Sequence, residues 1–167
     1  VEAGSPLFFD KKRPEILFTS PVSGEVAAVN RGEKRKILSV VVAADKENTY
    51  KSFSSLDLSK ASREQIIELL LESGLWTMFV QRPYGVVANP SDKPKAIFVS
   101  AFSTAPLAAS PEFTLQNELT NIQTAIDALG KLTTDKEVHL SLNSANYSGT
   151  PFHKLNNVIV HTFTGKH

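Results

Sequence analysis

The order of strand, helix and strand patterns in the C-terminal half of the chain constrains its fold more than any other feature of the sequence. Residues 96–101 ("AIFVSA") form an apolar run of the kind found in a strand that is covered on both faces. "SPEF" at 110–113 supplies a capping serine and a proline at the first helical position, and apolar residues follow at helical spacing as far as Gly130. The alternation at 138–142 and the run at 157–163 indicate two more strands. Short connections between these elements predict a βαβ unit with a parallel sheet and a right-handed crossover.

The first 44 residues contain short β-prone runs separated by turn residues, at positions 7–9, 16–18, 24–29 and 37–42. "NRG" at 30–32 is a tight-turn signal, because Asn and Gly both adopt positive φ angles. Strands of this length and spacing predict a small sandwich or barrel.

A polar stretch at 45–61 indicates a linker between these two parts. Ser62 and Gln65 then form a capping box for a helix, which Gly74 can end in the left-handed conformation. The predicted fold class is therefore α+β, with a β-rich module at 1–44, the linker at 45–61 and a Rossmann-like α/β domain at 62–167. Because the chain begins without a methionine, inside a strand-like pattern, we expect a piece of a longer protein whose α/β domain is truncated at its C-terminus.

Composition and charge argue against several classes of function. A net charge of +1, with no basic stripe interleaved with aromatics, gives no reason to expect nucleic acid. The absence of cysteine excludes disulfides and Cys-ligated zinc or iron–sulfur sites within these residues. No apolar run approaches the roughly 18 residues that a membrane span needs.

Two sets of polar residues remain as candidates for binding. The dense basic cluster of Lys34, Arg35 and Lys36 is expected on a solvated strand edge rather than at a phosphate site. The histidines lack the spacing of metal ligands and are expected on polar faces; they are His139, His153, His161 and His167.

The stretch 19–35, "TSPVSGEVAAVNRGEKR", resembles half of a lipoyl or biotinyl carrier domain, a family that presents one modified lysine on a hairpin. Lys11 and Lys12 stand where that lysine is expected, about a dozen residues before Ser23. Arg13-Pro14 follows them directly, however, and proline fixes φ and removes a hydrogen-bond donor where the carrier hairpin resumes its strand. The resemblance therefore implies the fold of a carrier, and a carrier modified at Lys11 or Lys12 stays open as the alternative function.

"SGLW" after a β module, followed by "AIFVSAFSTAPLAASP", is similar to the flavin- and NADH-binding subunit of respiratory complex I. In that family a glycine-rich loop, G-x-G-G-A-G-F-P, lets the FMN phosphate approach the backbone. Here the loop reads "GLWTMFVQRPYG", so the resemblance implies a degenerate flavin site at Gly74, Trp76, Phe79 and Arg82. The acidic residues that the family carries before a proline are likewise replaced, by residues 102–105 before Pro106. Trp76 and Phe79 are expected to fill the flavin cavity; the other contact considered for them is a quinone or a partner subunit.

Both departures point to one branch of that lineage. "SREQ", "LLESGLWT", "RPY", "AIFVSAFSTAPLAASPEF" and "HTFTGKH" resemble, nearly end to end, the A subunit of the bacterial sodium-translocating NADH:quinone reductase. The resemblance implies an accessory, non-flavin subunit of a respiratory-chain oxidoreductase that couples electron transfer from NADH to ubiquinone with sodium transport.

The same resemblance implies a place and a set of partners. The protein is expected to be peripheral at the cytoplasmic face of the inner membrane, held there only through partner subunits, with quinone as a further candidate ligand. Flavins, an iron–sulfur cluster and quinone belong to the whole complex. No catalytic residue, cofactor or metal site is expected in this fragment.

Overall fold

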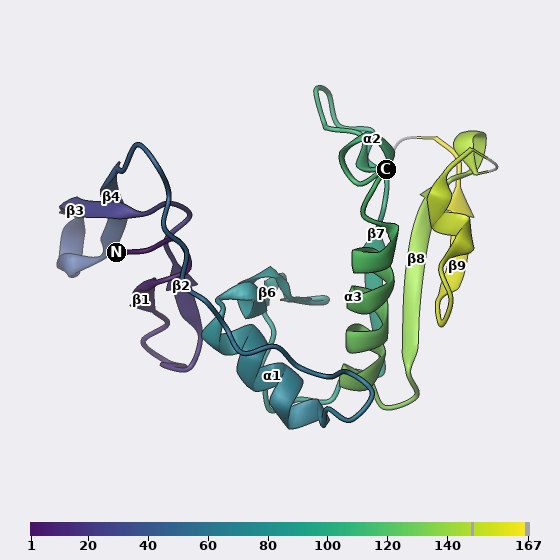
Figure 1. Cartoon of the computed structure of the whole chain (residues 1–167), viewed down its shortest axis with the longest axis horizontal. Coiled ribbons are helices and arrows are strands. Elements are labelled where there is room, and N and C mark those ends of the chain that lie inside the picture. The colour runs from purple at the N-terminus through teal and green to yellow at the C-terminus, as the bar shows by residue number, and fades with distance from the viewer. Residues whose placement is uncertain (148, 166–167) are drawn as a thin grey trace. The chain divides into compact units, whose positions relative to one another are not determined.

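The computed structural model describes residues 1–147 and 149–165 (Figure 1). The chain divides into two compact units. The first comprises Val1–Leu56 and Glu64–Pro90, and the second comprises Asp57–Arg63 and the residues from Ser91 onward. None of the described helices is long and apolar enough to cross a membrane.

The first unit begins with two separate antiparallel strand pairs. Strand β1 (Pro6–Phe9) pairs with β2 (Leu17–Thr19), and β3 (Gly24–Arg31) pairs with β4 (Ile37–Ala44). All four strands predicted from the sequence are present. Among the described residues they form two hairpins and no closed barrel.

The turn of the β3–β4 hairpin lies later than the sequence predicts. Asn30 and Arg31 are still in strand β3, and the chain reverses through the short 3₁₀ helix η1 (Glu33–Arg35). The Gly32 amide closes this turn by donating to the Lys36 carbonyl over 2.9 Å, and the positive φ angles fall on Lys34 and Arg35. The prediction of a tight turn at 30–32 is wrong because Asn30 is engaged across the ladder, where its side-chain amide donates to the Ser39 hydroxyl.

Ser23, which is fully buried, anchors the base of the same hairpin to the polar segment that follows it. Its hydroxyl donates to the Asp45 carboxylate over 2.8 Å and accepts from the Thr49 amide over 3.0 Å. Its own amide donates to the Asn48 side chain over 3.1 Å. A buried hydroxyl with both roles satisfied contributes stability that an unpaired one forfeits. The first part of the polar segment is therefore tied to the β module.

The remaining elements of the first unit are a helix and the loop that follows it. Helix α1 (Arg63–Glu72) has Ile66 and Ile67 on its buried face. The 3₁₀ helix η2 (Leu75–Met78) and the two-residue strands β5 (Val80–Gln81) and β6 (Val86–Val87) come next.

The second unit is built on a three-stranded parallel sheet, as the sequence predicts. The strands are β7 (Ala96–Ser100), β8 (Glu137–Asn143) and β9 (Ile159–Phe163), in the order β7-β8-β9. Helix α3 (Leu119–Leu132) connects the first two and lies alongside them (Figure 1). Its residues Leu119 and Ile122 pack on a core that includes Leu140 and Leu142 of β8.

The opposite face of this sheet is open in the described residues. Strand β8 alternates buried and half-buried side chains, and Phe98 of β7 is 74% exposed. The expectation that β7 is covered on both faces is therefore wrong, because only the α3 side is packed.

The helical pattern at 110–129 folds as two helices rather than one. Ser110 caps helix α2 (Pro111–Thr114) as predicted, by accepting from the Phe113 amide. Leu115 and Glu118 then leave helical geometry, and α3 starts at Leu119. Gly130 lies inside α3 and does not end it, since the helix continues to the buried Leu132. Two short 3₁₀ helices, η3 (Ser144–Asn146) and η4 (Pro151–Lys154), follow β8.

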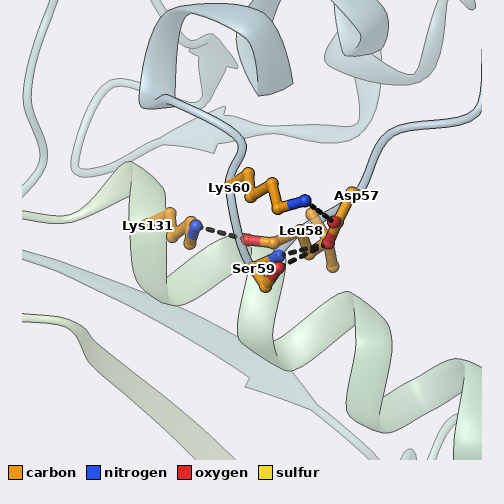
Figure 2. A network of polar contacts seen from close by, with 5 residues as sticks. All are labelled: Asp57, Leu58, Ser59, Lys60 and Lys131. Atoms are coloured by element: carbon orange, nitrogen blue, oxygen red, sulfur yellow. Dashed lines mark hydrogen bonds and ion pairs between the residues drawn. The ribbon is translucent and has the colours of Figure 1, made fainter.

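A polar network joins the end of α3 to the segment before α1 (Figure 2). The Lys131 ammonium donates to the carbonyls of Leu58 and Ala61, the second over 2.9 Å. The Asp57 carboxylate accepts from the hydroxyl and the amide of Ser59, and these two bonds hold the pKa of that carboxyl below its ordinary value. Residues 57–61 are thus held against α3 within the second unit.

Candidate functional site

The loop that resembles a degenerate flavin site starts at Gly74, where both the backbone conformation and the space available favour glycine. Gly74 has φ +76°, a conformation that costs an L-residue roughly 1–2 kcal/mol. A Cβ atom placed on it would also lie 2.7 Å from two side-chain atoms of Thr19 in strand β2. The loop therefore turns directly against the β1–β2 pair.

Trp76 fills the inside of this loop. Its side chain is only 4% exposed, its ring stacks on Phe79 at a centroid distance of 4.9 Å, and its indole N–H donates to the Ala88 carbonyl over 2.9 Å. A buried indole with its N–H satisfied contributes large apolar burial without an unpaired polar group. The expectation that an aromatic of this loop is buried is confirmed for Trp76.

The backbone of the loop is hydrogen-bonded to itself. The amides of Thr77, Phe79 and Ala88 donate to the carbonyls of Gly74, Trp76 and Phe79, over 3.3, 3.1 and 2.9 Å. Strands β5 and β6 pair beyond them. A phosphate cradle needs several backbone N–H groups pointing at the ligand, and these three are already engaged within the loop.

Arg82, the last residue of the predicted site, is exposed, whereas Trp76 is buried. Its side chain is exposed in the turn between β5 and β6, beside the exposed Tyr84, and its peptide bond to Pro83 is cis. The loop is also fastened from the β1–β2 connection, where the Arg13 guanidinium donates to the Val87 carbonyl over 3.2 Å. The structure therefore brings Gly74, Trp76 and Phe79 together and leaves Arg82 in solvent.

Lys11 and Lys12 are exposed in the connection between β1 and β2. The Asp10 side chain accepts from the Lys12 amide over 2.8 Å, and the Arg13 amide donates to the Asp10 carbonyl over 3.1 Å. The two lysines thus lie on the exposed connection of the β1–β2 hairpin.

A second place with polar side chains lies where the loops after β7 and β8 meet, and sequence reasoning missed it. An open hollow of about 540 Å³ is lined by Ser110, Glu112, Phe113, Ala145, Gly149 and Thr150. The Ser110 hydroxyl donates to the Glu112 carboxylate over 2.7 Å, and the buried Thr150 hydroxyl accepts from the Phe152 amide. The rule that ligands of parallel sheets bind beyond the carboxyl ends of the strands was the signal that could have found it.

Two of the histidines expected on polar faces lie side by side in the structure. His139 and His161 lie on neighbouring strands, and Nδ1 of the first is 2.9 Å from Nε2 of the second. The exposed Phe98 ring stacks on His139 at 4.7 Å. His153 contacts the Thr150 carbonyl, and His167 lies outside the described residues. Within the described part of the chain, no group of three or more His, Asp or Glu side chains is placed to hold a metal ion.

Comparison with known families matches both parts of the chain. The family model described as NqrA second alpha/beta domain matches residues 61–167, and the one described as NqrA N-terminal barrel-sandwich hybrid domain matches residues 1–45. The chain belongs to the NqrA family. The predicted family and the predicted fold class, a barrel-sandwich β module followed by an α/β domain, are confirmed.

Named relatives agree with the NqrA assignment. They are the A subunits of the Na(+)-translocating NADH-quinone reductases of two bacteria. The chain is 40% identical to the protein of Haemophilus influenzae strain PittGG, and 38% identical to that of Yersinia pseudotuberculosis serotype O:1b. Both alignments cover the whole of this chain and 37% of the relative. The chain thus spans a little over a third of the length of these curated relatives.

Proposed function

We propose that this NqrA-family chain serves as part of an accessory subunit of a sodium-translocating NADH:quinone reductase, an oxidoreductase that couples electron transfer from NADH to quinone with sodium export. It works through contacts with other subunits, at the cytoplasmic face of the inner membrane. Identity of 38–40% over the whole chain to proteins named as the A subunit of that enzyme supports this proposal.

The filled loop at 74–88 is the observation that supports a non-flavin role for this chain. Trp76 occupies the inside of the loop, and the amides of Thr77 and Phe79 are bonded within it. The residues present therefore do not fit an FMN phosphate, which needs bare backbone with free N–H groups. The flavins and the iron–sulfur cluster of the reaction are accordingly assigned to other parts of the complex, because these 167 residues also contain no cysteine.

Quinone is a candidate ligand of the whole complex, and no residue of this chain is assigned to bind it. Trp76 is buried and its N–H is taken by Ala88, so a packing role accounts for this aromatic better than a quinone contact does. Arg82 and Tyr84, on the exposed turn of the same loop, are free to contact a partner subunit.

Titration of the chain with FMN and with NADH tests the non-flavin role. Flavin fluorescence and equilibrium dialysis are expected to show no tight binding of either ligand, whereas a flavoprotein that retains the glycine-rich loop binds FMN in the same assay. Tight binding of either ligand by this chain would overturn the proposal.

Neither the family models nor the named relatives support the carrier alternative, in which the exposed Lys11 or Lys12 would be modified. Intact mass after co-expression with biotin and lipoate ligases separates the two functions. The reductase role predicts an unmodified mass, since Pro14 stands where the hairpin of a carrier resumes its strand. An adduct on either lysine would favour the carrier.

A further inference from the structure

The tip of the β3–β4 hairpin gathers four cations around one carboxylate, whereas the rest of the chain contains more acidic than basic residues. Arg31, Lys34, Arg35 and Lys36 are all exposed, and Glu33 is the one carboxylate among them. The whole chain carries a net charge of only +1, so this concentration does not reflect general basicity. Within the described residues, none of the four cations forms an ion pair with a carboxylate.

The backbone holds these cations at the turn. The Gly32 amide bonds to the Lys36 carbonyl over 2.9 Å, and the Arg31 guanidinium donates to the Arg35 carbonyl over 3.1 Å. Lys34 and Arg35 both take left-handed φ angles, of 53° and 63°. The sequence-based expectation of a solvated strand edge is therefore replaced by a closed turn with cations on its outside.

Exposed aliphatic side chains border the charged turn. Leu38 is 65% exposed, and it lies over Gly32, where an added Cβ would come within 3.2 Å of its methyl carbons. Ile37, Val29 and Val41 are also exposed on the same two strands. Aliphatic side chains that adjoin a group of Lys and Arg form the pattern by which peripheral proteins enter an anionic lipid headgroup layer.

We propose that the tip of the β3–β4 hairpin docks on an anionic phospholipid surface, with its cations at the headgroups and Leu38 entering the interface. Charge complementarity favours a lipid surface as the partner, because an anionic bilayer offers both dense negative charge and an apolar layer beneath it. This contact goes beyond the proposed function and departs from the expectation of membrane attachment only through partner subunits, since it is made by the chain itself.

Co-sedimentation with protein-free vesicles tests the proposal. The chain is expected to bind vesicles in which about a third of the lipid is phosphatidylglycerol, to leave vesicles of phosphatidylcholine alone unbound, and to dissociate as salt is raised. Each cation near such a surface contributes roughly fivefold to partitioning, so Lys34→Gln with Lys36→Gln is expected to lower binding by roughly 25-fold. Leu38→Ser is expected to weaken binding while leaving its salt dependence in place.

Lys11→Gln with Lys12→Gln provides the matched control, because it removes the same two charges from another exposed hairpin loop. This variant is expected to bind like the unmodified chain, and circular dichroism verifies that every variant stays folded. Absence of binding to the anionic vesicles, equal binding to both kinds of vesicle, or an equal loss in the control would overturn the proposal. Since the vesicles contain no protein, such a result leaves the proposed place in the reductase untouched.

Discussion

Trp76 carries the largest single packing contribution that can be assigned in the 74–88 loop. Its ring stacks on Phe79 and its N–H is bonded to Ala88, so truncation leaves both a cavity and an unpaired carbonyl. Trp76→Ala is expected to lower the free energy of unfolding by about 3–5 kcal/mol, measured by chemical denaturation, without creating affinity for FMN. A cavity alone supplies no backbone N–H groups for the phosphate.

Met78→Ala is the matched control, since Met78 lies in the same 3₁₀ helix and is 78% exposed. It is expected to change the free energy of unfolding by no more than about 0.5 kcal/mol. Denaturation of Trp76→Ala at the same midpoint as the unmodified chain would contradict the packing role and favour a contact with a partner or with quinone.

For single residues, the sequence predicts backbone conformation better than it predicts tertiary contacts. The glycine after an apolar helix predicted the left-handed angle of Gly74, because few other residues adopt it. The close approach of Thr19 to the same glycine was not predictable, since it depends on how strand β2 packs more than fifty positions away in the sequence. The indole bond to Ala88 escaped prediction because it too depends on tertiary packing.

Among the elements, the C-terminal end of helix α3 is bonded to the segment before α1 through Lys131, and its last carbonyl, of Leu132, accepts from Arg63. The ammonium donates to two carbonyls of the 57–61 segment, and a bond from a charged group contributes about 1.5–3 kcal/mol. Lys131→Met is expected to accelerate hydrogen exchange of the Lys60 and Ala61 amides, which are bonded to the Asp57 carbonyl in the same turn.

Lys154→Met serves as the control for that experiment, because Lys154 is an exposed lysine in the short helix η4. It is expected to leave both exchange rates unchanged. Equal protection of the two amides in Lys131→Met and in the unmodified chain would show that the 57–61 turn does not depend on the lysine.

The type of each helix or strand was predictable from the sequence. Where the helices end, and whether both faces of the sheet are covered, were not. Apolar alternation and capping residues predicted the parallel sheet and the start of α2, because those signals are local. The break at 115–118 was missed because the apolar spacing continues across it, and α3 keeps only the part that packs on β8. The open face of the sheet was missed because an apolar run does not show whether a second layer covers it.

For the whole molecule, the sequence predicted the family and the order of its two folds. The domain division at 45–61 stays a prediction. The family models match 1–45 and 61–167, while contacts group Glu64–Pro90 with the β strands. The hollow beyond β7 and β8 is formed by two loops that lie more than thirty positions apart in the sequence, so no local sequence pattern could predict it.

Co-purification with the other reductase subunits tests whether this chain works as part of the sodium-translocating reductase. The tagged protein is isolated from gently solubilised bacterial membranes, and the attached proteins are identified by mass spectrometry. We expect recovery of the other subunits of the sodium-translocating reductase together with sodium-stimulated NADH:quinone reductase activity. Recovery of a folded protein with none of those subunits and no such activity would contradict it.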